Sequence, residues 1–225
     1  MNNSNLQNSD PREKVGESFN EDDFLQAQKR GWEALYHVAQ MIKPGMVEAD
    51  AKKLLKEVMV EYNSEKIWHP PQVRFGVNTT LPFGKPQISD HVLQEDDLFF
   101  LDIGPVFNGY ESDIGETFQL GSNPITKKLI EDSKNIFSEV KKHWSTAGVN
   151  GEELYQFATG LAGERGWKLA LEGASGHRIS EFPHAAHFRG KLKGFDLTPT
   201  RSRWILEIHL IDPGRKVGAF FEDVL

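Results

Sequence analysis

The sequence contains no cysteine among its 225 residues. This absence excludes a disulfide framework, a thiol nucleophile and a thiolate metal site. No apolar run approaches the ~20 residues that a helix needs to cross a bilayer, so we expect no membrane span. The N-terminal stretch from Met1 to Asp10 lacks the charged and apolar regions of a signal peptide. A cytoplasmic protein is therefore the default expectation.

Positive charge is also scarce, with 26 Lys and Arg against 33 Asp and Glu and a net charge of −7. Without a basic stripe or an arginine-rich helix, the chain has little with which to neutralise a run of phosphates, so we expect no nucleic-acid partner. A hydrophobic content of 38% is enough for one sizeable core. Residues 1–20 are polar and are predicted to be a disordered tail. Residues 21–225 are predicted to form a single domain.

Apolar periodicity and capping residues predict four helices. The first spans Glu21 to Ile42, the second Val47 to Tyr62, and the third Ile125 to Trp144. Asn150 with Glu153 has the spacing of a capping box at the start of the fourth. Each pair of helices is followed by a strand-rich segment with a turn in it. This order predicts an α+β fold built from two pseudo-twofold halves.

The first strand-rich segment carries two acids, Asp102 and Asp113, among apolar residues. Asn108-Gly109 lies between two β-rich runs and predicts a two-residue hairpin turn. In that hairpin Asp113 faces Gly104. Asp102 lies on the same face as Asp113, as a diagonal neighbour roughly 7–8 Å away from Asp113. Two buried carboxylates repel each other, and no Lys or Arg lies in the segment. We therefore predict that a metal ion lies between them.

The second strand-rich segment also carries a pair of acids on two strands joined by a turn. Here the acids are Glu207 and Glu222, and the turn is Asp212-Pro-Gly-Arg215. A loop centred between Gly214 and Arg215 would place the two acids directly opposite each other. A loop centred one residue earlier would place them diagonally. Either way they share a face, because side-chain direction alternates along a strand. Two matched acid pairs predict two divalent ions bridged by shared oxygens.

Two histidines in the stretch from Gly176 to His184 could add an imidazole to this centre. Pro183 argues against a helix there, so spacing does not decide between His177 and His184, or whether His187 contributes. An imidazole among carboxylates shifts preference from magnesium or calcium toward Mn, Fe, Co or Zn.

The order of these residues, from Asp102 to the final Glu222-Asp223, resembles that of the pita-bread metallopeptidases, which include methionine aminopeptidase, aminopeptidase P and prolidase. The resemblance runs roughly from Phe24 to the C-terminus, and in size the chain resembles the stand-alone catalytic domain. It implies a curved antiparallel sheet covered by helices. It also implies five ligands for two divalent ions (Mn, Co, Fe or Zn): Asp102, Asp113, His177, Glu207 and Glu222.

The resemblance further implies hydrolysis of the first peptide bond of a peptide. Glu207 or Glu222 would be the general base for the attacking water, and His184 would donate a hydrogen bond to the developing oxyanion. The oligomeric state is left open, a homodimer included.

Phe83 occupies the position where the aminopeptidases carry a substrate-contacting histidine. Phenylalanine donates no hydrogen bond, so the missing polar contact is absent or comes from His69, His91 or His187. Several methionine-aminopeptidase signatures are missing, which favours an Xaa-Pro aminopeptidase or dipeptidase over a methionine aminopeptidase. A catalytically silent binding module and a metal-free, creatinase-like hydrolase are further alternatives, and the five retained ligands argue against both.

Overall fold

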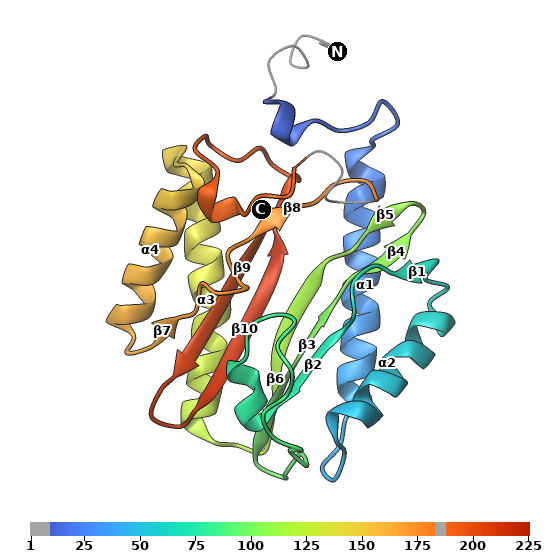
Figure 1. Cartoon of the computed structure of the whole chain (residues 1–225), viewed down its shortest axis with the longest axis vertical. Helices are drawn as coiled ribbons and strands as arrows, with labels where there is room; N and C mark the ends of the chain where they lie inside the picture. The colour runs from blue at the N-terminus through green and yellow to red at the C-terminus, as the bar shows by residue number, and fades with distance from the viewer. Residues whose placement is uncertain (1–9, 183–187) are drawn as a thin grey trace.

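The structure is a computed structural model, and it describes residues 10–182 and 188–225 (Figure 1). The described residues form four α-helices at the predicted positions: α1 (Glu21–Met41), α2 (Glu48–Glu61), α3 (Pro124–Ala147) and α4 (Gly151–Glu164). Asn20 caps α1 by accepting hydrogen bonds from two backbone N–H groups of its first turn. Asn150 and Glu153 form the predicted capping box of α4. None of these helices is long and apolar enough to span a membrane.

A seven-stranded antiparallel sheet forms the centre of the fold, in the order β2-β3-β6-β10-β9-β7, with β8 also paired to β9. A smaller sheet has the order β1-β4-β5. The strands are β1 (Lys66–Ile67), β2 (Gln72–Phe75), β3 (Asp97–Ile103), β4 (Pro105–Phe107), β5 (Tyr110–Glu111), β6 (Ile114–Leu120), β7 (Lys168–Leu169), β8 (His177–Arg178), β9 (Trp204–Asp212) and β10 (Val217–Val224). Short 3₁₀ helices occupy Pro11–Glu13, Gly76–Thr80 and Leu192–Gly194.

Each half of the sheet has its own helix pair (Figure 1). Each helix pair packs on its half of the sheet through a separate hydrophobic core. Helices α1 and α2 pack on β2 and β3 through residues that include Leu35, Leu55 and Phe99. Helices α3 and α4 pack on β9 through residues that include Val140, Leu154, Leu206 and Leu210. The halves join where β6 pairs with β10. This is the pseudo-twofold α+β arrangement that the sequence predicts.

The first acid-bearing hairpin has the predicted register. Phe107 pairs with Tyr110, and both Asn108 and Gly109 adopt positive φ, as a two-residue primed turn requires. Beyond this tip the hairpin leaves the small sheet and joins the large one, where Asp102 pairs with Gly115. Asp113 lies in the short break between β5 and β6.

The second hairpin adopts the first of the two registers considered. Glu207 pairs directly with Glu222, and Asp212 pairs with Val217 across the loop. Asp212 Oδ1 accepts a hydrogen bond from Gly214 N at 2.9 Å, which closes this wider turn. The loop is therefore centred between Gly214 and Arg215.

Residues 10–20 differ from the tail expected for them, whereas residues 1–9 lie outside the described residues. Glu13 is buried and accepts hydrogen bonds from Trp204 Nε1 at 2.5 Å and Thr200 N at 2.7 Å. Arg178 Nε donates to the carbonyl of Arg12 at 2.8 Å. Residues 10–20 are thus attached to the domain by hydrogen bonds to residues distant in the sequence, as well as by apolar packing of Phe19. Polar composition alone does not reveal such contacts, which is why the sequence predicted a disordered tail.

Candidate metal centre

Three acids form a single row across four adjacent strands. Gly115 on β6 pairs with Asp102 of β3 on one side and with Glu222 of β10 on the other, and Glu222 pairs with Glu207 of β9. Laterally paired residues point to the same face of a sheet, so the three carboxylates converge. Asp113 lies two residues before Gly115 and completes the group of four acids.

Gly115 supplies the space in the middle of this row. A Cβ at this position would lie 2.9 Å from Glu222 Oε1 and 2.6 Å from the ring of Phe220. Real Cβ atoms essentially never approach other heavy atoms so closely, so a side chain here would displace Glu222. A gap in the side-chain layer between two carboxylates is the room that an ion requires.

His177 comes to the centre from β8, which pairs with β9. Its Nε2 lies 3.1 Å from Asp113 Oδ2, and the ligand atoms of Asp113, His177 and Glu222 lie within 4.8 Å of one another. The structure thus places all five expected ligands around one cavity. The other two candidates of this region, His184 and His187, lie outside the described residues.

The carboxylates of the centre are buried and strongly perturbed. Burial raises the pKa of Asp102 to about 7, although the nearby His69 opposes this shift. Burial, reinforced by Asp102 and Asp113, raises the pKa of Glu222 well above its ordinary value. The pKa of Asp113 is instead lowered, because hydrogen bonds from His177 and His69 outweigh the effect of burial.

These observations test whether the residues fit metal ions. Glu222 Oε1 is buried and has no hydrogen-bond partner among the described residues. Buried acids that raise one another's pKa values require added positive charge if all are to be ionised. Four carboxylates and an imidazole are the donor types that bind hard and borderline divalent ions. The donor set therefore fits the metals that the sequence predicts.

The centre opens into a cavity of about 330 Å³ whose walls include Trp68, Phe83 and Lys191. A larger hollow of about 860 Å³ lies between α1 and α3 on the other face of the sheet, but it contains none of the candidate ligands. The smaller cavity is therefore the candidate substrate site, because it combines a volume suited to a small ligand with the perturbed acids.

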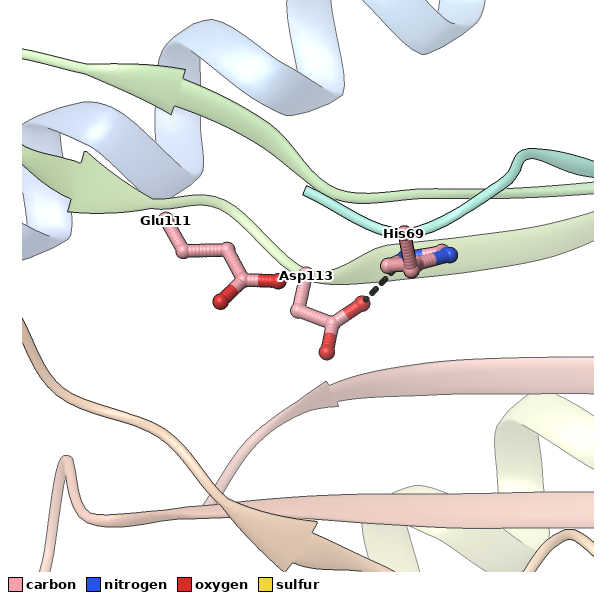
Figure 2. A group of neighbouring side chains, drawn as sticks. All are labelled: His69, Glu111 and Asp113. Carbon is pink, nitrogen blue, oxygen red and sulfur yellow. Dashed lines mark hydrogen bonds and ion pairs between the residues drawn. The ribbon is translucent and has the colours of Figure 1, made fainter. Parts of the chain in front are cut away.

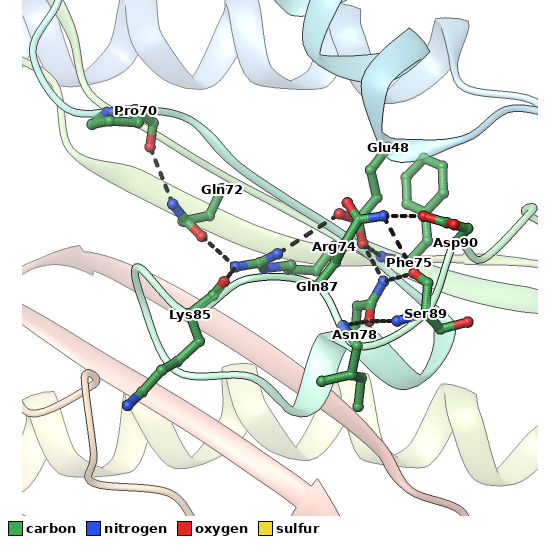
Figure 3. Close-up of polar contacts among 11 residues, drawn as sticks. Glu48, Pro70, Gln72, Arg74, Phe75, Asn78, Lys85, Gln87, Ser89 and Asp90 are labelled. Carbon is green, nitrogen blue, oxygen red and sulfur yellow. Dashed lines mark hydrogen bonds and ion pairs between the residues drawn. The ribbon is translucent and has the colours of Figure 1, made fainter.

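Phe83 lies at the wall of this cavity and is 48% exposed. A polar network ties the loop that contains Phe83 to α2 and β2 (Figure 3). Asn78 Nδ2 donates to Glu48 Oε1 and to Ser89 O, both at 2.8 Å, and Ser89 N donates back to Asn78 Oδ1 at 3.2 Å. Arg74 Nη1 lies 3.7 Å from Glu48 Oε2. This network fixes the backbone on both sides of Phe83.

Of the three histidines considered for the missing polar contact, His69 lies in the cavity. Its Nε2 is 3.3 Å from Asp113 Oδ1 and 3.5 Å from Asp102 Oδ1. Its ring packs edge-on against Phe83, with 5.6 Å between the ring centroids. His91 instead contacts Asp97, with its Nε2 at 2.5 Å from Oδ2.

The sequence reasoning missed Glu111. Its ligand oxygen lies within 4.8 Å of those of His69 and Asp113, and Figure 2 shows Asp113 between the other two. Burial, followed by the charge of Asp113, raises the pKa of Glu111 to about 10. The signal was available, because Glu111 lies two residues before Asp113 and side-chain direction has a period of two.

Comparison with known proteins identifies the class of this fold and site. The chain matches metallopeptidase family M24 over residues 22–225 and therefore belongs to that family. A methionine aminopeptidase from Helicobacter pylori strain J99 is 28% identical over 162 residues, which cover 68% of this chain and 61% of that relative.

Two solved structures show the same fold. The X-Pro aminopeptidase from Thermotoga maritima MSB8 superposes with a TM-score of 0.74 at 23% identity, covering 95% of this chain and 60% of that one. A methionine aminopeptidase from Thermotoga maritima has a TM-score of 0.65 at 16% identity and 90% coverage of both chains. The pita-bread fold is thus confirmed. The chain spans about three fifths of the H. pylori relative and of the X-Pro aminopeptidase.

Proposed function

We propose that this protein is a metallo-aminopeptidase that removes the N-terminal residue from peptides with the help of two divalent ions. The observation that carries this proposal is the row of Asp102, Glu222 and Glu207 across four strands around Gly115. Asp113 and His177 lie against this row. A purely structural role for such a buried acid cluster would be costly, because each unpaired charge must be desolvated.

The proposed ligands are Asp102, Asp113, His177, Glu207 and Glu222, and the proposed ions are Mn, Co, Fe or Zn. When bound, a pair of such ions supplies a water nucleophile at neutral pH and polarises a carbonyl. The protein's own part is to hold these donors in place. Glu207 is held by Gly176 N, which donates to its Oε2 at 2.5 Å, and by the hydroxyl of Tyr155 against its backbone.

Proton transfer is assigned to Glu207 or Glu222, which face each other across the strand pair. Either carboxylate can accept the proton of the attacking water and later deliver it to the leaving amine. His184, which lies outside the described residues, is proposed from the sequence to donate a hydrogen bond to the substrate carbonyl as its oxygen gains charge.

For specificity we propose a preference for proline in the second position of the substrate. Phe83 presents an apolar ring to the cavity where a polar contact would otherwise be, and an apolar wall suits the proline ring. Methionine aminopeptidase is the second candidate, because the H. pylori relative has that activity in its name.

The test compares kcat/KM for Met-Ala and Ala-Pro peptides with each of the four metals supplied. We expect faster cleavage of the Ala-Pro peptides, and faster cleavage of Met-Ala would refute the proline preference. Cleavage of no peptide, with metal bound, would favour the binding-module alternative. Phe83→His should raise kcat/KM for Met-Ala selectively, and Phe83→Leu is the matched control because it keeps the wall apolar.

A further inference from the structure

His69 and His177 both place their Nε2 atom next to the carboxylate of Asp113. His177 Nε2 lies 3.1 Å from Asp113 Oδ2, and His69 Nε2 lies 3.3 Å from the other oxygen, Oδ1. The two imidazoles therefore flank a single buried carboxylate. We propose that His69 is a sixth protein ligand of the centre and binds the ion that Asp102 and Asp113 would share. This inference rests on the proposed function and adds a ligand that the family resemblance does not include.

The distances suit two ligands of one ion. Donors bound at ~2.0–2.2 Å to the same ion lie about 2.8–3.6 Å apart for bond angles between octahedral and tetrahedral values. His69 Nε2 is 3.3 Å from Asp113 Oδ1 and 3.5 Å from Asp102 Oδ1. Hydrogen bonds from N–H to oxygen usually measure roughly 2.7–3.2 Å, so the 3.3 Å contact between His69 Nε2 and Asp113 is a long one. The ring is therefore placed at ligand separation from two carboxylates at once.

The other ring nitrogen prepares His69 for this role. His69 Nδ1 lies 3.2 Å from the carbonyl oxygen of Pro70, and His177 Nδ1 lies 2.9 Å from that of Arg178. A carbonyl oxygen accepts hydrogen bonds only, so it favours the tautomer with the proton on Nδ1. Without an ion, Nε2 makes its hydrogen bond to Asp113. With an ion bound, the proton on Nδ1 would leave the lone pair on Nε2, which faces the carboxylates. Metal-bound histidines commonly have this second contact, and both rings here make it with the next residue in the chain.

The backbone at Trp68 and Gly104 leaves space for the imidazole ring of His69. Trp68 N donates to Gly104 O at 2.7 Å, which anchors the chain beside His69 to the first hairpin. A Cβ at Gly104 would lie 2.5 Å from His69 Cδ2 and 2.9 Å from Glu111 Oε1. Only glycine therefore leaves room for both side chains. Glu111 places a further carboxylate oxygen within 4.8 Å of His69 and Asp113 (Figure 2).

One imidazole for each ion should change the choice of metal. Imidazole ligands favour Zn, Cu, Fe and Ni, whereas sites made of oxygen donors suit Mg and Mn. Loss of His69 should therefore weaken Zn²⁺ and Co²⁺ at one site more than it weakens Mn²⁺. A histidine that contacts only substrate would leave these affinities unchanged.

The test is a calorimetric titration of chelator-treated full-length protein with Co²⁺, with wild type, His69→Ala and His177→Ala side by side. Wild type should bind two ions, and each variant should lose at least about 100-fold in affinity at one site, the upper end of the range for groups that support a ligand. His91→Ala is the matched control, because His91 contacts Asp97 and not the centre. It should bind both ions as wild type does.

X-ray absorption of the Co²⁺-loaded wild type needs no variant and would show one imidazole per ion, against half an imidazole per ion if His177 is the sole histidine ligand. That lower value, or unchanged affinity at both sites in His69→Ala, would overturn the inference. A wild-type protein that binds no Co²⁺, Mn²⁺ or Zn²⁺ would instead refute the proposed function. The two failures are therefore distinguishable.

Discussion

Replacing Asp113 by asparagine removes one negative charge from the centre and leaves the size of the side chain almost unchanged. Asp113 is 2% exposed, and its two oxygens face His177 and His69 at 3.1 and 3.3 Å. Water cannot replace the lost oxygen ligand at so buried a position without rearrangement. The amide nitrogen would also present hydrogens where a cation should lie. We therefore expect Asp113→Asn to weaken metal binding strongly.

The magnitude follows from the position of Asp113 between the two imidazoles. Supporting groups around metal sites contribute about 10–100-fold in affinity, so a shared ligand should contribute at least about 100-fold, or about 2.7 kcal/mol. At a metal concentration of about 1,000 times the wild-type Kd, binding stabilises the wild type by about 4.1 kcal/mol. The variant, at about 10 times its own Kd, gains about 1.4 kcal/mol.

These energies convert to a measurable shift in melting temperature. For a chain of 225 residues, 1 kcal/mol corresponds to about 2–4 °C. The metal-induced rise in Tm should therefore be about 8–16 °C in the wild type and about 3–6 °C in Asp113→Asn. Each protein is compared with its own metal-free form by scanning calorimetry, so loss of packing does not enter the difference.

Asp90→Asn is the matched control, because it makes the same chemical change at an exposed loop position. It should retain the full metal-induced rise. An undiminished rise in Asp113→Asn would refute the assignment of Asp113 as a ligand, whatever its effect on activity.

Two further predictions concern residues outside the row of acids. His184→Ala should keep the wild-type metal stoichiometry and lower kcat by roughly 100-fold or more, because it removes a donor to the transition state; loss of metal from this variant would mean that the roles of His184 and His177 are exchanged. Glu13→Ala should lower the free energy of unfolding by about 1–3 kcal/mol, because it leaves the buried indole N–H of Trp204 without its acceptor and removes the hydrogen bond from Thr200 N. Urea denaturation measures this loss, and an unchanged midpoint would mean that the contacts of Glu13 contribute nothing to stability.

Local features of the sequence determined the elements that carry the centre. Asn108-Gly109 can adopt the positive φ values of a primed turn, and this set the register that pairs Asp102 with Gly115. The capping box at Asn150 and Glu153 determined where α4 begins. These predictions succeeded because turn and cap energies depend on residues only a few positions apart. The order of acids and histidine was likewise sufficient to indicate the family.

Tertiary structure alone decided how these elements meet. The pairing of β6 with β10 brings two hairpins together around Gly115, and no local rule predicts which strands become neighbours. The sequence allowed two registers for the second hairpin, and the pairing of β9 with β10 has the one in which Glu207 lies directly opposite Glu222. His69 reached the centre, and Glu13 reached Trp204, through contacts between segments that are distant in the chain. Such contacts depend on the packing of the whole sheet and its helices, so their free energy is not encoded in any short stretch of sequence.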